Sequence, residues 1–170
     1  MANKFLKMVT GARSEGQSID TSAGAGSEGS ITALDSTGRV ALNMMPVGVL
    51  PEAVTCATSE NLVAGNLVNL YSNGGTLTAR KADNSNSREC HGFVLAGTSS
   101  PANAVVYLAG NNTGVSGKTI GAVQYLGTVG AAVEAGSLPT GAGKIVQTIG
   151  KAISATEITF EPNDPITLIA

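Results

Sequence analysis

From about residue 53 to the C-terminus, short apolar runs alternate with turn residues along the chain. Leu67–Tyr71 and Thr76–Lys81 flank Asn73-Gly74-Gly75, which favours a tight β-hairpin because Asn and Gly accept the positive φ angles of the turn. The run Glu157–Glu161 alternates polar and apolar residues, as a half-buried strand does. This pattern predicts an all-β fold, either a small antiparallel β-barrel or a sandwich.

Other runs of the same kind complete the predicted fold. Further strands are expected at Gly92–Leu95, Ala104–Leu108, Gln124–Leu126, Ala131–Val133, Lys144–Ile149 and Lys151–Ser154. Gly150 lies between two of these runs and indicates a bulge or a bend of a small barrel. The best helical window, residues 59–68, is interrupted by Gly65, so little helix is expected.

The first fifty residues differ in amino-acid composition from the rest of the chain. From Ser14 to about Ser36 the chain is rich in Gly, Ser, Ala and Thr, with no aromatic residue and few large aliphatic ones. Such a stretch cannot bury enough apolar area to form a core of its own. We therefore expect residues 1–50 to form an extended arm and linker that contacts neighbouring subunits, and residues 51–170 to form the β-barrel domain.

Large apolar side chains nevertheless occur at two places in this arm, residues 5–9 and residues 40–45. An apolar anchor on a tether can reach a neighbour and add a strand or fill a groove. The second group could instead cap the barrel of its own chain. The predicted interface residues are Phe5, Leu6, Met8, Val9, Val40, Leu42, Met44 and Met45.

The amino-acid composition limits the classes of function that the protein can have. Charged residues make up 13% of the chain, against about 25% in typical globular proteins, and the net charge is -2. The ten Lys and Arg are scattered, so the sequence offers no cationic surface for nucleic acid. His91 is the single histidine, and most acid–base catalysis needs clustered titratable groups, so we expect no enzymatic activity and no cofactor. A carboxylate pair among Glu157, Glu161 and Asp164 is the enzymatic alternative.

Motifs for other chemistry are incomplete. Gly24–Gly29 matches the letters of a dinucleotide-binding loop, but no predicted strand precedes it and no helix follows it. Cys56 and Cys90 are far apart, without metal-ligand spacing, and are predicted to be reduced, packed thiols. No apolar run reaches the length of about 18 residues that a membrane-spanning helix needs. Lys7 interrupts the apolar N-terminus, so we expect no secretory signal and retention in the cytoplasm where the chain is made.

Turn glycines and strand patterns recur in several runs between Glu60 and Pro165. These runs are Leu62–Tyr71, Arg80–Asp83, His91–Leu95, Val106–Gly114, Gln124–Gly127 and Ile149–Pro162. Together they resemble the small β-barrel modules of tailed-bacteriophage capsid decoration (cement) proteins and head-fibre proteins. The stretch Ser36–Pro46 is similar to the link that precedes such modules.

The resemblance implies a structural virion protein, assembled in the bacterial cytoplasm and located on the capsid surface. Such a protein binds the major capsid protein, stabilises contacts between its subunits and often forms a homotrimer; no catalytic residue, cofactor, metal, membrane or nucleic acid is implied. The alternative is a tail-fibre or baseplate module that binds a host-surface glycan. Trp is absent, so Tyr71, Tyr107 and Tyr125 would be the main platforms for stacking sugar rings.

Overall fold

The computed structural model describes residues 4–34, 36, 38–41, 44–45 and 52–169. The chain divides into two compact units, Met1–Leu50 and Pro51–Ala170. Within the described ranges the regular structure is all β, with short 3-10 turns and no α-helix. None of the helical turns in these ranges is long and apolar enough to cross a membrane. The predicted fold class is confirmed.

Unit 1, the name used here for residues Met1–Leu50, contains β1 (Lys4–Val9), β2 (Ala12–Gln17) and the 3-10 turn η1 (Gly24–Ser27). Unit 2, residues Pro51–Ala170, contains the remaining elements. These are β3 (Ala53–Thr58), β4 (Leu67–Asn73), β5 (Thr76–Lys81), β6 (Gly92–Phe93), β7 (Asn103–Tyr107), β8 (Gly110–Asn112), β9 (Val123–Leu126), β10 (Ala132–Val133), η3 (Ala135–Ser137), β11 (Ile145–Val146), β12 (Thr148–Ser154), β13 (Glu157–Phe160) and β14 (Ile166–Thr167).

Five strands of unit 2 close into a barrel in the order β3-β5-β4-β6-β7. The predicted hairpin is confirmed as β4 and β5, which pair antiparallel and turn at Gly74 and Gly75, with φ angles of 60° and 87°. One pairing departs from the antiparallel expectation, because β3 and β5 run parallel, with Ala57 opposite Thr78. Parallel neighbours need a longer connection than a hairpin turn, and here β4 lies between them in the chain.

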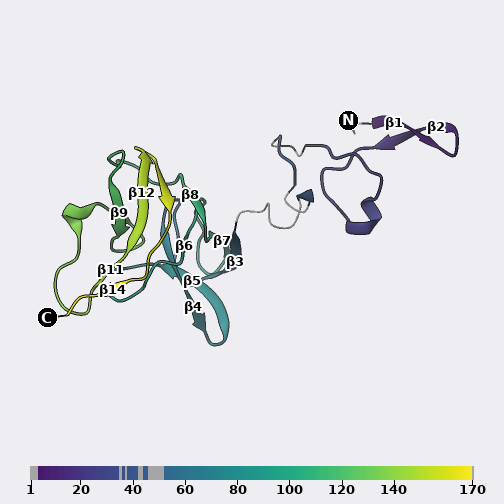
Figure 1. Ribbon diagram of the computed structural model, residues 1–170. Helices are drawn as coiled ribbons and strands as arrows, with labels where there is room; N and C mark the ends of the chain where they lie inside the picture. Colours follow the sequence, from purple (N-terminus) through teal and green to yellow (C-terminus); the bar gives the residue numbers. More distant parts are fainter. Residues whose placement is uncertain (1–3, 35, 37, 42–43, 46–51, 170) are drawn as a thin grey trace. The chain divides into compact units, whose positions relative to one another are not determined.

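A second, five-stranded sheet has the order β10-β9-β12-β13-β8 (Figure 1). The pairing of β12 with β9 shifts register between Thr148 and Gly150, so the bulge predicted at Gly150 is confirmed. The single strand predicted over residues 144–149 is divided instead into β11 and the start of β12, with Gln147 between them. β11 pairs with β14 near the C-terminus, which forms a small separate ribbon.

Two apolar clusters hold unit 2 together. The first fills the barrel and consists of Cys56, Leu62, Val68, Ala79, Val94, Ala104 and Val106. The second joins the barrel to the second sheet and consists of Leu67, Ala82, Cys90, Phe93, Leu126, Ala132, Ile145, Ile149, Ala152, Ile158 and Phe160. Leu67 and Val68 are adjacent in β4 and fully buried, but they belong to different clusters because successive side chains of a strand point to opposite faces.

Aromatic rings lie at the junction between barrel and sheet. The ring of Phe93 in β6 stacks on that of Tyr107 in β7, with 5.5 Å between the centroids. The same ring lies 5.1 Å from that of Phe160 in β13, in a tilted arrangement. Phe93 is 1% exposed, so these contacts fix the barrel against the second sheet in a water-free environment.

Candidate interaction surface

The large apolar residues near the N-terminus lie on a β-hairpin. β1 and β2 pair in full register from Lys4 opposite Gln17 to Val9 opposite Ala12. The loop between them has two residues, Thr10 and Gly11, with φ angles of 49° and 84°. Two successive positive φ angles are typical of the tight turn that matches the twist of a hairpin.

The faces of this hairpin differ. Directly opposite residues share a face, so Phe5 lies over Gly16, where an added Cβ atom would be 2.6 Å from the ring atom Cζ. Phe5 is therefore half-buried against its own hairpin. Leu6 and Met8 point to the other face and are 74% and 65% exposed.

Charged side chains flank Leu6 and Met8 on this face. Lys4 Nζ lies 2.7 Å from Glu15 Oε2, and both side chains are more than half exposed. Arg13 is the residue directly opposite Met8. The face is therefore an exposed apolar pair bordered by charges of both signs.

The other predicted interface residues are distributed over unit 1. Val9, Val40 and Met45 are exposed, and Met44 is half-buried. Leu42 lies outside the described residues. The structure therefore brings Leu6 and Met8 together on one face of the hairpin, whereas Phe5 and Val9 belong to the opposite face. Sequence reasoning missed Ile31 and Leu34, which are 51% and 60% exposed and border a shallow groove with Lys4 and Phe5.

Unit 1 has no buried apolar core among its described residues, where Gly16 is the single buried residue. All the buried apolar side chains of the two core clusters belong to unit 2, beginning at Cys56. A two-stranded hairpin alone in water is marginally stable at best. Unit 1 thus combines a paired backbone with large apolar side chains that its own described residues do not cover.

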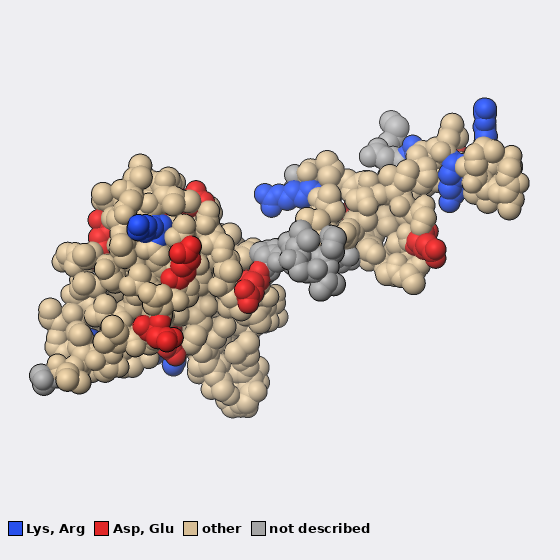
Figure 2. All heavy atoms as spheres, viewed as in Figure 1, with Lys and Arg blue, Asp and Glu red and all other residues tan. Residues whose placement is uncertain are grey.

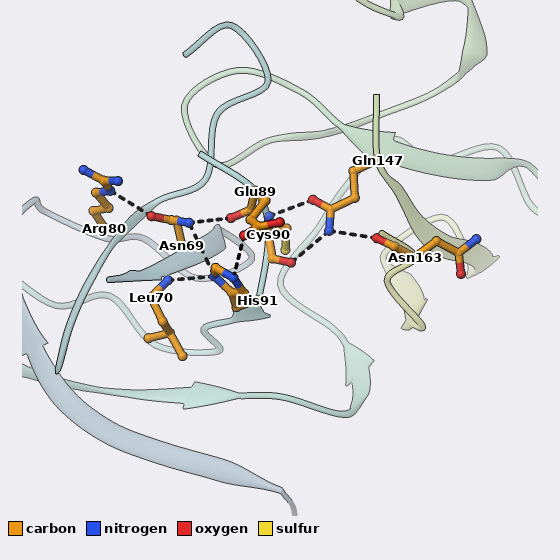
Figure 3. Close-up of polar contacts among 8 residues, drawn as sticks. All are labelled: Asn69, Leu70, Arg80, Glu89, Cys90, His91, Gln147 and Asn163. Atoms are coloured by element: carbon orange, nitrogen blue, oxygen red, sulfur yellow. Dashed lines mark hydrogen bonds and ion pairs between the residues drawn. The ribbon is translucent and has the colours of Figure 1, made fainter. Parts of the chain in front are cut away.

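The single histidine, His91, is held by hydrogen bonds to neighbouring residues of the barrel (Figure 3). The backbone N–H of Leu70 donates to His91 Nδ1 at 3.0 Å, so this nitrogen carries the lone pair and the proton belongs on Nε2. His91 Nε2 faces Glu89 Oε1 at 3.2 Å. Next to it, Asn69 donates to the carbonyl of Glu89 and accepts from Arg80 Nε. These contacts tie β4, β5 and the segment before β6 together.

The carboxylates of the enzymatic alternative lie at the surface. Glu157 Oε1 accepts a hydrogen bond from Asn111 at 2.9 Å, and Glu161 and Asp164 are exposed. In the ranges that the structure describes, no three His, Cys, Asp or Glu residues come together as a metal site. On the face of each unit that Figure 2 shows, Lys, Arg, Asp and Glu form separate spots rather than a field of one sign.

The rings of Tyr71 and Tyr107 contact neighbouring side chains. Arg80 Cζ lies 4.1 Å from the ring centroid of Tyr71, a cation–π geometry. Tyr107 is stacked on Phe93. Tyr125 is half-buried in β9. A sugar ring could stack only on the face of Tyr71 that Arg80 does not cover, or on the face of Tyr107 that Phe93 does not cover.

Both cysteines are free and buried, as predicted. Burial raises the pKa of the Cys90 thiol to about 12, and burial also raises that of Cys56. We expect alkylation of Cys90 by iodoacetamide at pH 8 to be slower by a factor of at least about 100 in the folded protein than in guanidinium, because the thiolate is the reactive species. Mass spectrometry of each cysteine peptide measures both rates. Equal rates for Cys90 in the two states would contradict its burial.

No protein-family model matches the sequence, and no curated protein matches it. Among solved structures, the chain is similar to the crystal structure of the head fiber gp8.5 N base in bacteriophage phi29, with 13% sequence identity and a TM-score of 0.44. The match covers 66% of this chain and 95% of that chain.

Proposed function

We propose that the chain is a non-enzymatic structural protein of a phage virion that binds the outer surface of the capsid. Unit 1 makes the contact with the major capsid protein and so stabilises contacts between its subunits, while unit 2 stands as a folded β module on the particle. The sequence resemblance to decoration and head-fibre modules supports this assignment.

The observation that carries the proposal is the exposed apolar surface of unit 1. Seven large apolar side chains there are at least 37% exposed: Leu6, Met8, Val9, Ile31, Leu34, Val40 and Met45. Unit 1 also carries four basic and four acidic residues, so its net charge is zero. Binding of unit 1 therefore depends on apolar contact more than on long-range attraction to a strongly charged partner.

A capsid repeats each binding site many times by symmetry. We further propose that three copies assemble on the capsid. When several copies of unit 1 are linked, binding of the first raises the effective concentration of the others, which gives avidity without new kinds of contact.

Replacing Leu6 and Met8 together by serine is expected to reduce decoration of heads at least about tenfold, because burying two large apolar side chains contributes about 1.5–3 kcal/mol each. The assay is co-sedimentation of the full chain with heads purified from phage that lack this protein. The matched control is the double serine variant at Ile120 and Ile166, which are 71% and 68% exposed but belong to unit 2. Equal binding by both double variants and by the original chain would refute the role of unit 1.

A further inference from the structure

The hairpin of unit 1 has two outer edges. β1 and β2 form a sheet of two strands, so each strand pairs on one side only. The outer edge of each strand then presents backbone N–H and C=O groups on which another strand can pair.

The register identifies the groups on each outer edge. In a hairpin with a two-residue loop, the pair that closes the loop, Val9 and Ala12, exchanges hydrogen bonds across the hairpin. Pairs alternate from there, so the backbone groups of Lys4, Leu6 and Met8 point outward from β1. Those of Arg13, Glu15 and Gln17 point outward from β2.

The two edges differ in the side chains that accompany these outward groups. On β2 they are charged or polar, and charged residues are a common protection of edge strands. On β1 they are Lys4, which is paired with Glu15, and the exposed apolar Leu6 and Met8. The chain beyond β2 is also engaged, because Ile19 N donates to Ile31 O and Ile19 O accepts from Ala33 N. No described segment other than β2 pairs with β1.

A second copy of the chain is a poor partner for the β1 edge. β1 contains Lys4 and Lys7 and no acidic residue, so antiparallel pairing of two β1 strands would bring lysines from both copies close together. Two six-residue strands bury far less than the roughly 800 Å² per partner of a stable protein interface, so this contact alone would not hold two chains together, whereas linked copies on a capsid gain avidity. Lys7 makes no ion pair with any described residue, so its charge is available to a partner.

We propose that the outer edge of β1 pairs with an exposed edge strand of the major capsid protein, which thereby gains the hairpin as two additional strands. The partner strand presents apolar side chains beside Leu6 and Met8 and an acidic side chain near Lys7. This inference rests on the proposed function, since it names the contact by which unit 1 binds the capsid.

Proline substitutions at two directly opposite residues, one on each strand, distinguish binding through the β1 edge from binding through the β2 edge. Pro removes a backbone N–H and is tolerated on an edge strand where that N–H faces outward. Met8→Pro removes an outward donor from β1, and the matched control Arg13→Pro removes one from β2. We expect Met8→Pro to weaken binding of the full chain to undecorated heads at least about 100-fold, and Arg13→Pro to change it less than about threefold.

Hydrogen exchange of the original chain gives a second readout that does not depend on the variants. On binding to heads, the amides of Leu6 and Met8 are expected to become protected, while those of Arg13 and Glu15 keep their exchange rates. The β1-edge contact would be overturned if the two proline variants behaved alike, both losing binding or both keeping it, and exchange at Leu6 and Met8 did not change. Binding of the original chain to heads would still establish capsid binding in that case. Absence of binding by the original chain would refute the proposed function itself.

Discussion

Replacing Gly150 with alanine is expected to lower the free energy of unfolding of unit 2 by at least about 4 kcal/mol, a loss that few single substitutions cause. Gly150 lies at the bulge of β12 with a φ of 154°. A Cβ atom here would be 2.1 Å from the carbonyl oxygen of Thr159 and 2.8 Å from its carbonyl carbon. These are backbone atoms of the neighbouring strand β13, so they cannot move aside by a side-chain rotation. The bulge would have to open, and the second core cluster around Ile149 and Ile158 would open with it.

Urea unfolding followed by circular dichroism measures this loss, with Gly136→Ala as the matched control. Gly136 lies in η3, has no positive φ angle, and an added Cβ there would meet no atom within 4 Å. The control is expected to change the free energy of unfolding by less than about 1 kcal/mol, since Gly→Ala is tolerated where the backbone is compatible. A Gly150→Ala protein as stable as this control would show that the bulge does not require glycine.

The second large effect is expected at Gln147, where substitution by alanine should lower the free energy of unfolding by about 3 kcal/mol. Its side-chain amide accepts from Cys90 N at 2.7 Å and donates to Cys90 O at 3.0 Å and Asn163 O at 3.1 Å (Figure 3). Gln147 is 3% exposed and Cys90 is 2% exposed. Truncation therefore leaves a buried donor and two acceptors without these partners, and an unsatisfied buried group costs about 1–3 kcal/mol.

Asn86→Ala is the control for Gln147→Ala, because Asn86 is an exposed amide in the loop before β6. Its replacement is expected to change stability by less than about 0.5 kcal/mol. The Gln147 variant should also show faster hydrogen exchange at the amide of Cys90. Unchanged stability and unchanged exchange at Cys90 would mean that water replaces the lost side chain, contrary to the burial of the site.

The parts of the fold that sequence analysis predicted correctly are those with a local signal. The β4–β5 hairpin follows from Asn73-Gly74-Gly75 between two β-favouring runs, and the bulge follows from a glycine inside a β run. The β1–β2 hairpin has a similar signal, Thr10-Gly11 between six-residue runs, but β2 contains Arg13, Ser14 and Glu15 and lacks the alternation of a half-buried strand. The sequence pattern therefore predicts an extended segment here but not its pairing.

Other elements depend on contacts between distant segments. β8, with the sequence Gly-Asn-Asn, has no β propensity and becomes a strand because it pairs with β13. The division between β11 and β12 at Gln147 reflects hydrogen bonds to Cys90 and Asn163, which lie 57 and 16 residues away in the chain. No periodicity over a short window contains this information.

The sequence by itself determined the fold class, the barrel hairpin, the bulge glycine and the shortage of apolar residues in the first fifty positions, because each depends on the conformational preferences or composition of a continuous segment. The tertiary structure decided which strands are neighbours, that β3 and β5 run parallel, and that Leu6 and Met8 share one face while Phe5 is held over Gly16. Strand order, register and the exposure of a side chain are set by pairing and packing between segments, and local sequence does not specify the partner.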